Sequence, residues 1–132
     1  MANHTALIVA RPGRLRNSLS ALLTALPYVG QVRVVDSGSS ALAMVAELRP
    51  SLILLDASLA GDQVLTLESR LKAVEPHARC IVITDDPDRP RVAKPGGADV
   101  ILLKGFTTSQ LYLAIEGLLS GQPVGQNALG EV

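Results

Sequence analysis

The sequence predicts an α/β fold in which one parallel sheet of five strands is covered by helices on both faces. Five short apolar runs rich in Val, Ile and Leu recur along the chain, and runs of this kind without polar alternation are typical of strands buried on both sides. Segments with the spacing of amphipathic helices lie between them. Because crossovers between parallel strands are right-handed, this order indicates a doubly wound sandwich.

The predicted strands coincide with the five apolar runs. They span residues 5–10, 31–36, 51–56, 79–84 and 99–103. Arg33 interrupts the second run, so we expect that strand to lie near an edge of the sheet. The fourth run, RCIVIT, contains the single cysteine, Cys80, which we interpret as a buried small apolar residue.

Three of the four connections, and the segment after the last strand, carry apolar residues at helical spacing, which makes the predicted fold a flavodoxin-like (βα)5 sandwich. The first helix is expected to stop at Pro27, and the last to begin with hydroxyl caps and to end on Gly121. The side chains expected to face the sheet are Leu15, Leu19, Leu22, Leu23, Leu26, Leu42, Val45, Ala46, Leu48, Val64, Leu67, Leu71, Val74, Leu111, Ala114, Ile115 and Leu118.

The fourth connection, DDPDRPRVAKPGG (85–97), differs from the others. Its three prolines leave room for at most a turn or two of helix, so we expect a shortened fourth helix. All five repeats then fall within a single domain, residues 1–121, and residues 122–132 are expected to form a loose C-terminal tail.

Composition narrows the classes of function. Apolar residues make up 48% of the 132 residues, and 12 basic residues balance 12 acidic ones, so no long-range field favours nucleic acid or an anionic membrane. The first ten residues do not predict a signal peptide, and no apolar run approaches the roughly 18 residues of a membrane span. The lone cysteine suits a reducing compartment. We expect a cytoplasmic protein that binds neither nucleic acid nor membrane by itself.

Polar residues close the apolar runs, and in a parallel sheet they converge on one edge. The residues at these positions are Ala10, Arg11, Asp36, Asp56, Ser58, Thr84, Asp85 and Lys104. The stretch LILLDAS (52–58) places Asp56 directly after four apolar residues. Because Asp commonly ends strands and opens turns, a purely structural role is the competing interpretation of this carboxylate.

Three of these positions resemble the phosphoacceptor site of the response-regulator receiver family. Asp56 ends the third strand, Thr84 the fourth and Lys104 the fifth, and the segment GADVILLKGFTTSQLYLAIEGLLSGQPV is similar to receivers found ahead of helix-turn-helix output domains. The resemblance covers about residues 5–121. It implies that Asp56 has the place of the phosphoacceptor nucleophile, Lys104 that of the phosphoryl-binding cation, and Thr84 that of the hydroxyl donor.

The sequence departs from the family pattern where a metal ion is bound. Members that accept a phosphoryl group end the first strand with an acidic pair, and here those positions are Ala10 and Arg11. Mg²⁺ requires several oxygen ligands, normally including carboxylates, so we expect weak or absent Mg²⁺ binding and no other metal site. Arg11 is either an exposed loop residue or a cation that joins Lys104 in neutralising Asp56.

Two further departures concern signalling. The aromatic residue that precedes the family's lysine by three positions is Ile101 here, and the proline that follows the aspartate by four positions is Ala60. In the family, that aromatic side chain turns inward when the threonine moves toward the phosphoryl group. We therefore expect both the phosphorylation event and the conformational change that follows it to be altered.

These observations lead to three hypotheses of function. The leading one is a receiver-like, non-enzymatic module of two-component (phosphorelay) signalling that acts by protein contact without ordinary Mg²⁺-dependent phosphorylation. The alternative is a working phosphoacceptor modified on Asp56. A third hypothesis is a nucleotide- or flavin-binding module, with Arg14 and the start of the first helix holding an anion. The resemblance implies a protein partner, either a histidine kinase or an output or regulatory protein.

The last predicted helix suggests a contact surface. Leu111, Tyr112 and Leu113 cannot all face the sheet at helical spacing, so this helix is expected to expose an apolar side chain. We therefore expect dimerisation or partner binding through the fifth helix, with Leu111 and Tyr112 as the named candidates.

Overall fold

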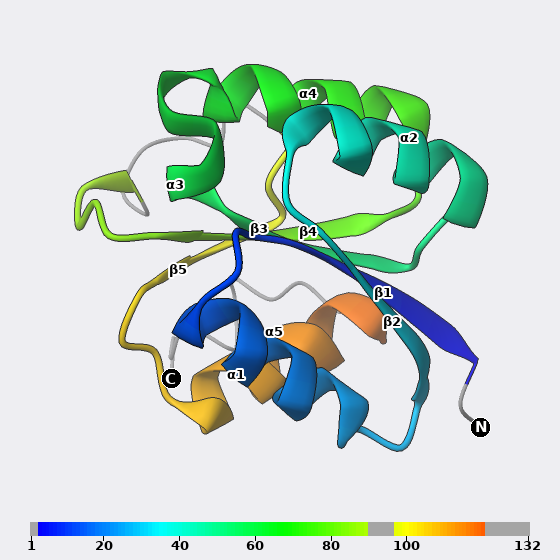
Figure 1. Ribbon diagram of the computed structural model, residues 1–132. Coiled ribbons are helices and arrows are strands. Elements are labelled where there is room, and N and C mark those ends of the chain that lie inside the picture. Colours follow the sequence, from blue (N-terminus) through cyan, green and yellow to red (C-terminus); the bar gives the residue numbers. More distant parts are fainter. Residues whose placement is uncertain (1–2, 90–96, 121–132) are drawn as a thin grey trace.

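The protein is described by a computed structural model that covers residues 3–89 and 97–120. Its sheet contains the strands β1 (His4–Val9), β2 (Val29–Val35), β3 (Leu52–Asp56), β4 (Arg79–Thr84) and β5 (Val100–Leu103). They pair in parallel in the order β2-β1-β3-β4-β5 (Figure 1). This order confirms the predicted doubly wound sheet and places β2 at an edge, as Arg33 indicated.

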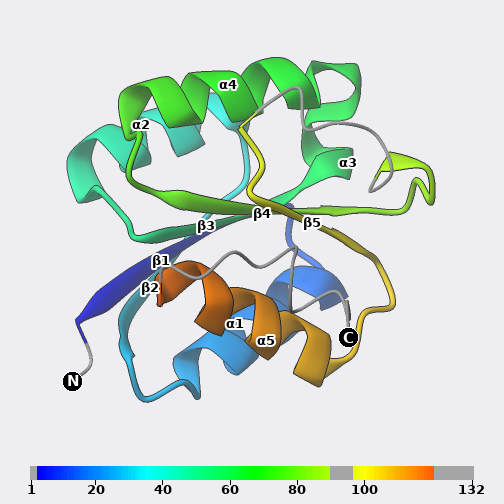
Figure 2. The same ribbon diagram turned by 180° about the vertical axis from the view of Figure 1, so that it is seen from behind.

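Helices cover both faces of the sheet. Helices α1 (Arg14–Thr24) and α5 (Thr108–Leu119) lie on one face, and α2 (Gly38–Leu48), α3 (Ala57–Ala60) and α4 (Val64–Val74) lie on the other (Figures 1 and 2). A short 3-10 turn, η1 (Gly61–Gln63), joins α3 to α4. The predicted hydroxyl caps are present, because Ser37 accepts a hydrogen bond from the Ser40 N–H and Thr107 forms a capping box with Gln110.

Alternate residues of each strand enter two separate cores. Leu54 and Ile81 face α1 and α5 in one core, whereas Leu55 and Val82 face α2 and α4 in the other. Every residue of β3 is buried, which explains why its sequence shows no polar alternation. The central strand that delivers Asp56 is therefore held on both sides.

Two residues predicted to face the sheet are instead exposed, namely Ala46 and Val74. On α2 the inward stripe is formed by Ala41 and Val45, and Ala46 lies a further 100° around the helix. On α4 the stripe runs through Leu67 and Leu71 and includes Glu68 rather than Val74, which is the last residue of the helix. The first helix also ends earlier than predicted, at Thr24.

Two predictions fall outside the described residues. The shortened fourth helix was expected in the connection after β4, of which residues 90–96 are not described, and the tail 122–132 and Gly121 are not described either. None of the helices within residues 3–89 and 97–120 is long and apolar enough to cross a membrane.

Candidate functional site

Asp56 lies at the carboxyl end of β3, where it also begins α3. The residue is 8% exposed, and its Oδ1 accepts hydrogen bonds from the Ser58 N–H at 3.0 Å and the Ser58 hydroxyl at 2.8 Å. The side chain is thus the N-cap of α3. The structural and the functional interpretation of Asp56 are thus compatible. The same aspartate caps a helix and lies at the edge where a parallel sheet presents its functional groups.

Lys104 approaches Asp56 from the end of β5. Its Nζ lies 3.3 Å from Asp56 Oδ1, 3.5 Å from Ser58 Oγ and 4.0 Å from Asp85 Oδ2. The backbone fixes this position, because the Lys104 N–H donates to the Thr84 carbonyl oxygen at 2.8 Å. Gly105 follows with a φ of 96°, a conformation that favours glycine and lets the chain turn away at once.

Thr84 is buried at the end of β4. Its Oγ1 accepts a hydrogen bond from the Asp86 N–H at 3.1 Å, and this interaction leaves the hydroxyl proton available for donation. Thr84 also lines a cavity together with Ser58. The structure therefore gathers Asp56, Thr84 and Lys104 at one sheet edge, as the parallel-strand argument predicts.

The two positions of the missing acidic pair do not reach Asp56. Ala10 is buried in the core beneath α1 and α5, whereas Arg11 is exposed and, among the described residues, forms no ion pair or hydrogen bond with Asp56. Of the two interpretations of Arg11, the structure shows the exposed loop residue. Lys104 and Ser58 engage Asp56 Oδ1, whereas Arg11 keeps its charge in solvent, where it bears no desolvation cost.

The donor set at this edge does not fit Mg²⁺. Asp56 is the one buried carboxylate at the strand ends, and its Oδ1 is engaged by a cation and two further donors. Ala10 and Arg11 offer no carboxylate oxygen, and within the described ranges no group of three His, Cys, Asp or Glu residues is placed to hold a metal ion. Mg²⁺ keeps several waters but is normally anchored by one or two carboxylates, and the acidic pair that would join Asp56 is missing here.

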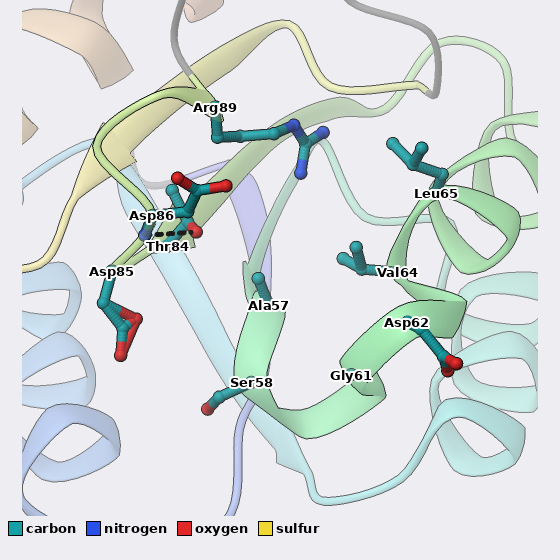
Figure 3. A pocket seen from close by; sticks show the side chains of 10 residues that line it. All are labelled: Ala57, Ser58, Gly61, Asp62, Val64, Leu65, Thr84, Asp85, Asp86 and Arg89. Atoms are coloured by element: carbon teal, nitrogen blue, oxygen red, sulfur yellow. Dashed lines mark hydrogen bonds between the residues drawn. The ribbon is translucent and has the colours of Figure 1, made fainter.

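A cavity of about 620 Å³ opens between α3, the start of α4 and the segment after β4 (Figure 3). Arg89 points into it from above, between Ala57 and Leu65. The Nη2 atom of Arg89 donates to both carboxylate oxygens of Glu68, at 3.0 and 2.9 Å. Glu68 is fully buried, and the Arg89 side chain is only 11% exposed. Arg89, held by this ion pair, lines the cavity together with Thr84.

Sequence reasoning missed this ion pair and the Ser58 hydroxyl. Glu68 follows Val64 by four residues and precedes Leu71 by three, so it belongs to the same inward stripe of the helix. A charged residue in that stripe is a usable signal, because a buried carboxylate requires a partner. Arg89, by contrast, lies in a proline-rich connection whose course no periodicity reveals.

The fifth helix exposes an apolar residue, but not the ones named. Leu111 is fully buried, which removes it from any contact surface. Tyr112 is half-buried and its hydroxyl donates to the Leu22 carbonyl oxygen at 2.8 Å, so it joins α5 to α1. Leu113 is 53% exposed and is the residue that a partner can reach. Ile101, at the aromatic position of β5, is half-buried and packs against the core on the α2 and α4 side.

Comparisons with known proteins agree with this geometry. A family model for the response regulator receiver domain matches residues 7–116. The response regulator GacA of Pseudomonas aeruginosa is 25% identical over 119 residues, 88% of this chain and 55% of GacA; GacA of Pseudomonas viridiflava matches with the same figures. The chain thus spans about half the length of the curated relatives it matches.

Solved structures share the fold. The signal receiver domain of an HD domain-containing protein from Pseudomonas fluorescens Pf-5 is 26% identical, with a TM-score of 0.79 over 92% of this chain and 90% of that one. A two-component response regulator of the LuxR family from Aurantimonas sp. SI85-9A1 has the same TM-score at 20% identity, over 91% of this chain and 87% of that one. At 20% identity, the similarity to the Aurantimonas protein shows a shared fold and nothing more.

Proposed function

The chain belongs to the response regulator receiver domain family, and on that premise we propose that it is a receiver module that acts by protein contact without ordinary Mg²⁺-dependent phosphorylation. The observation that carries this proposal is the replacement of the acidic pair by a buried Ala10 and an exposed Arg11, next to a retained Asp56, Thr84 and Lys104. Such a module takes part in two-component signalling through a histidine kinase or an output or regulatory protein.

The charge balance at the sheet edge supports this proposal. Phosphoryl transfer to a carboxylate requires a cation that offsets the charge on the phosphoryl oxygens. Here Lys104 Nζ is 3.3 Å from Asp56 Oδ1 and already compensates the carboxylate. Two like unit charges at 4 Å repel by roughly 4 kcal/mol in a surface-like medium, and without the acidic pair the described residues place no second buried carboxylate beside Asp56 to offset the repulsion between a divalent ion and Lys104.

The alternative function, phosphorylation of Asp56, has one observation in its favour. Asp56, Thr84 and Lys104 lie together at the strand ends with the Thr84 hydroxyl proton available. A phosphoryl donor that brings its own charge compensation would find the nucleophile, the cation and the hydroxyl in place. The two candidates therefore differ in metal binding and in covalent modification of Asp56.

The decisive experiment measures both metal binding and covalent modification of Asp56. NMR amide shifts of Asp56, Thr84 and Lys104 are followed during titration with Mg²⁺, without and with beryllofluoride, and intact mass is measured after incubation with acetyl phosphate. We expect no saturable shifts and no added phosphate. Covalent phosphate that is lost in Asp56→Asn would overturn the proposal in favour of the phosphoacceptor.

A gain-of-function variant serves as the positive control. Ala10→Asp combined with Arg11→Asp supplies two carboxylates and removes a cation, so saturable Mg²⁺-dependent shifts are expected in this variant. Arg11→Ala alone removes the cation without adding oxygen ligands, so this variant is expected to show no saturable Mg²⁺-dependent shifts. If the doubly substituted chain folds but still ignores Mg²⁺, the acidic pair is not what limits metal binding.

A further inference from the structure

The cavity beside Asp56 combines an apolar lining with an acidic rim. Ala57, Val64 and Leu65 line it from α3 and α4, and the Leu65 side chain is left 40% exposed. Three exposed carboxylates stand around it, those of Asp62, Asp85 and Asp86 (Figure 3). Such a cavity suits an apolar group that arrives with positive charge beside it.

Among the described residues, the two cations beside this cavity, Arg89 and Lys104, have anionic partners. Arg89 donates to both oxygens of Glu68, and Lys104 lies 3.3 Å from Asp56 but 4.0 Å from Asp85. Their charges are thus largely balanced, and the three rim carboxylates give the described part of the opening a net negative charge. The whole chain has a formal net charge of zero, so this is a local feature rather than a reflection of overall composition.

We propose that this cavity is the docking site for a partner-protein segment that presents an aliphatic side chain beside lysine or arginine. The aliphatic group contacts Val64 and Leu65, and the basic residues face Asp62 and Asp86. The inference rests on the proposed function, because protein contact is taken to be the output of the module. It adds the chemistry of the partner, and it also makes acidic ligands and nucleic acid poor candidates for this surface.

Three blocked tripeptides separate the contributions of charge and apolar contact. Acetyl-Arg-Leu-Arg-amide, acetyl-Glu-Leu-Glu-amide and acetyl-Arg-Ser-Arg-amide are titrated into the ¹⁵N-labelled chain without Mg²⁺ or any phosphoryl donor. We expect saturable amide shifts of Ala57, Gly61 and Leu65 with the first peptide alone. Equal shifts with the Glu-Leu-Glu peptide, or none with any peptide, would overturn the proposal.

Variants at the cavity sharpen the test. Asp86→Asn is expected to weaken binding of the Arg-Leu-Arg peptide by about two- to fivefold, as for an exposed ion pair, and Leu65→Ser by about three- to tenfold. Glu116→Gln and Leu113→Ser are the matched controls, because both residues are exposed on α5 on the opposite face of the sheet. Equal weakening by the controls would contradict docking at the cavity.

This test is independent of phosphorylation chemistry. Covalent phosphate on Asp56 would overturn the proposed function and leave peptide binding unaffected, whereas failed peptide binding would leave the absence of Mg²⁺ binding intact. A second copy of the chain is the competing occupant. Self-association in sedimentation that Leu65→Lys removes and Leu113→Ser does not would assign the cavity to that copy and overturn the partner assignment.

Discussion

Asp56 uses one oxygen atom for two purposes. Its Oδ1 caps α3 through the Ser58 N–H and also faces Lys104. The helix cap fixes the rotamer of the side chain, and the fixed rotamer places the carboxylate within reach of Lys104. A structural and a functional interpretation of this residue are therefore not alternatives.

Replacing Asp56 tests this dual role. Asp56→Ala removes the cap and leaves Lys104 without its partner, so the free energy of unfolding in urea is expected to fall by about 1–3 kcal/mol. Asp56→Asn is expected to be milder, because the amide oxygen still accepts hydrogen bonds. Asp85→Ala, an exposed neighbour, should stay within about 0.5 kcal/mol of the wild type. Alanine and asparagine variants of equal stability would contradict the interpretation.

Cys80 provides a test that depends on pH. Burial, and secondarily the charge of Glu68, raises the pKa of the Cys80 thiol from 9.0 to about 12. The thiol should therefore resist iodoacetamide at neutral pH until urea unfolds the chain.

The same shift predicts how stability changes in alkaline solution. The unfolded thiol releases its proton near pH 9 and the folded one near pH 12. The stability that the protonated, buried thiol contributes is therefore complete below pH 9 and is lost as the pH rises between the two values. The loss is on the order of 1 kcal/mol per pH unit. Cys80→Ala should lose less stability than the wild type over this interval, whereas identical pH profiles would show that the thiol does not titrate there.

At the scale of elements, α4 holds both described ends of the β4–β5 connection. Arg89 pairs with Glu68, and beyond the segment that is not described Asp99 forms an ion pair with Lys72 at 2.9 Å. Gly97 lies between these contacts, where a Cβ atom would stand 2.7 Å from the Glu68 carbonyl oxygen and would also collide with Lys72. Glu68 and Lys72 are one helical turn apart, so a single helix face fastens the connection.

The Glu68–Arg89 pair is expected to matter most when only one partner is removed. Arg89→Met leaves a fully buried carboxylate unpaired and should cost about 3–5 kcal/mol of the free energy of unfolding. Replacing Glu68 and Arg89 together by methionine should restore most of this loss, because no buried charge remains. Arg70→Met, at an exposed site on α4, is the control and should change little. A double variant as unstable as Arg89→Met would show that the loss is not electrostatic.

On the scale of the whole molecule, the two faces of the sheet offer different contact surfaces. The α3 and α4 face carries the acidic-rimmed cavity, and the α1 and α5 face exposes Leu113. Leu111 is buried and Tyr112 is tied to Leu22, so Leu113 is the exposed large apolar side chain that α5 offers for a contact.

Leu113→Glu tests this second surface. We expect the wild type to self-associate in sedimentation at high protein concentration and the variant to do so less, because a carboxylate would be desolvated in an apolar contact. Unfolding in urea should be unchanged by this surface substitution. Leu65→Glu is the matched variant on the other face and should leave self-association intact. A wild type that remains monomeric at every concentration would contradict this expectation.

The sequence by itself determined the fold and the position of the site. The five apolar runs predicted five strands, and parallel strands bring their carboxyl ends to one edge. Asp56, Thr84 and Lys104 were therefore placed together before any coordinates, and the edge position of β2 followed from Arg33. Local patterns suffice because a few neighbouring residues specify each strand, and the geometry of a parallel sheet then brings the strand ends together.

Only the tertiary structure decided which polar groups actually meet. The sequence left open whether Arg11 joins Lys104 at Asp56 or stays an exposed loop residue. In the structure Lys104 lies 3.3 Å from Asp56, with its N–H bound to the Thr84 carbonyl oxygen, and Arg11 is exposed. The Glu68–Arg89 pair joins residues 21 positions apart. Side-chain contacts over such separations are set by how helices and loops pack on the sheet, and no spacing along the chain encodes that packing.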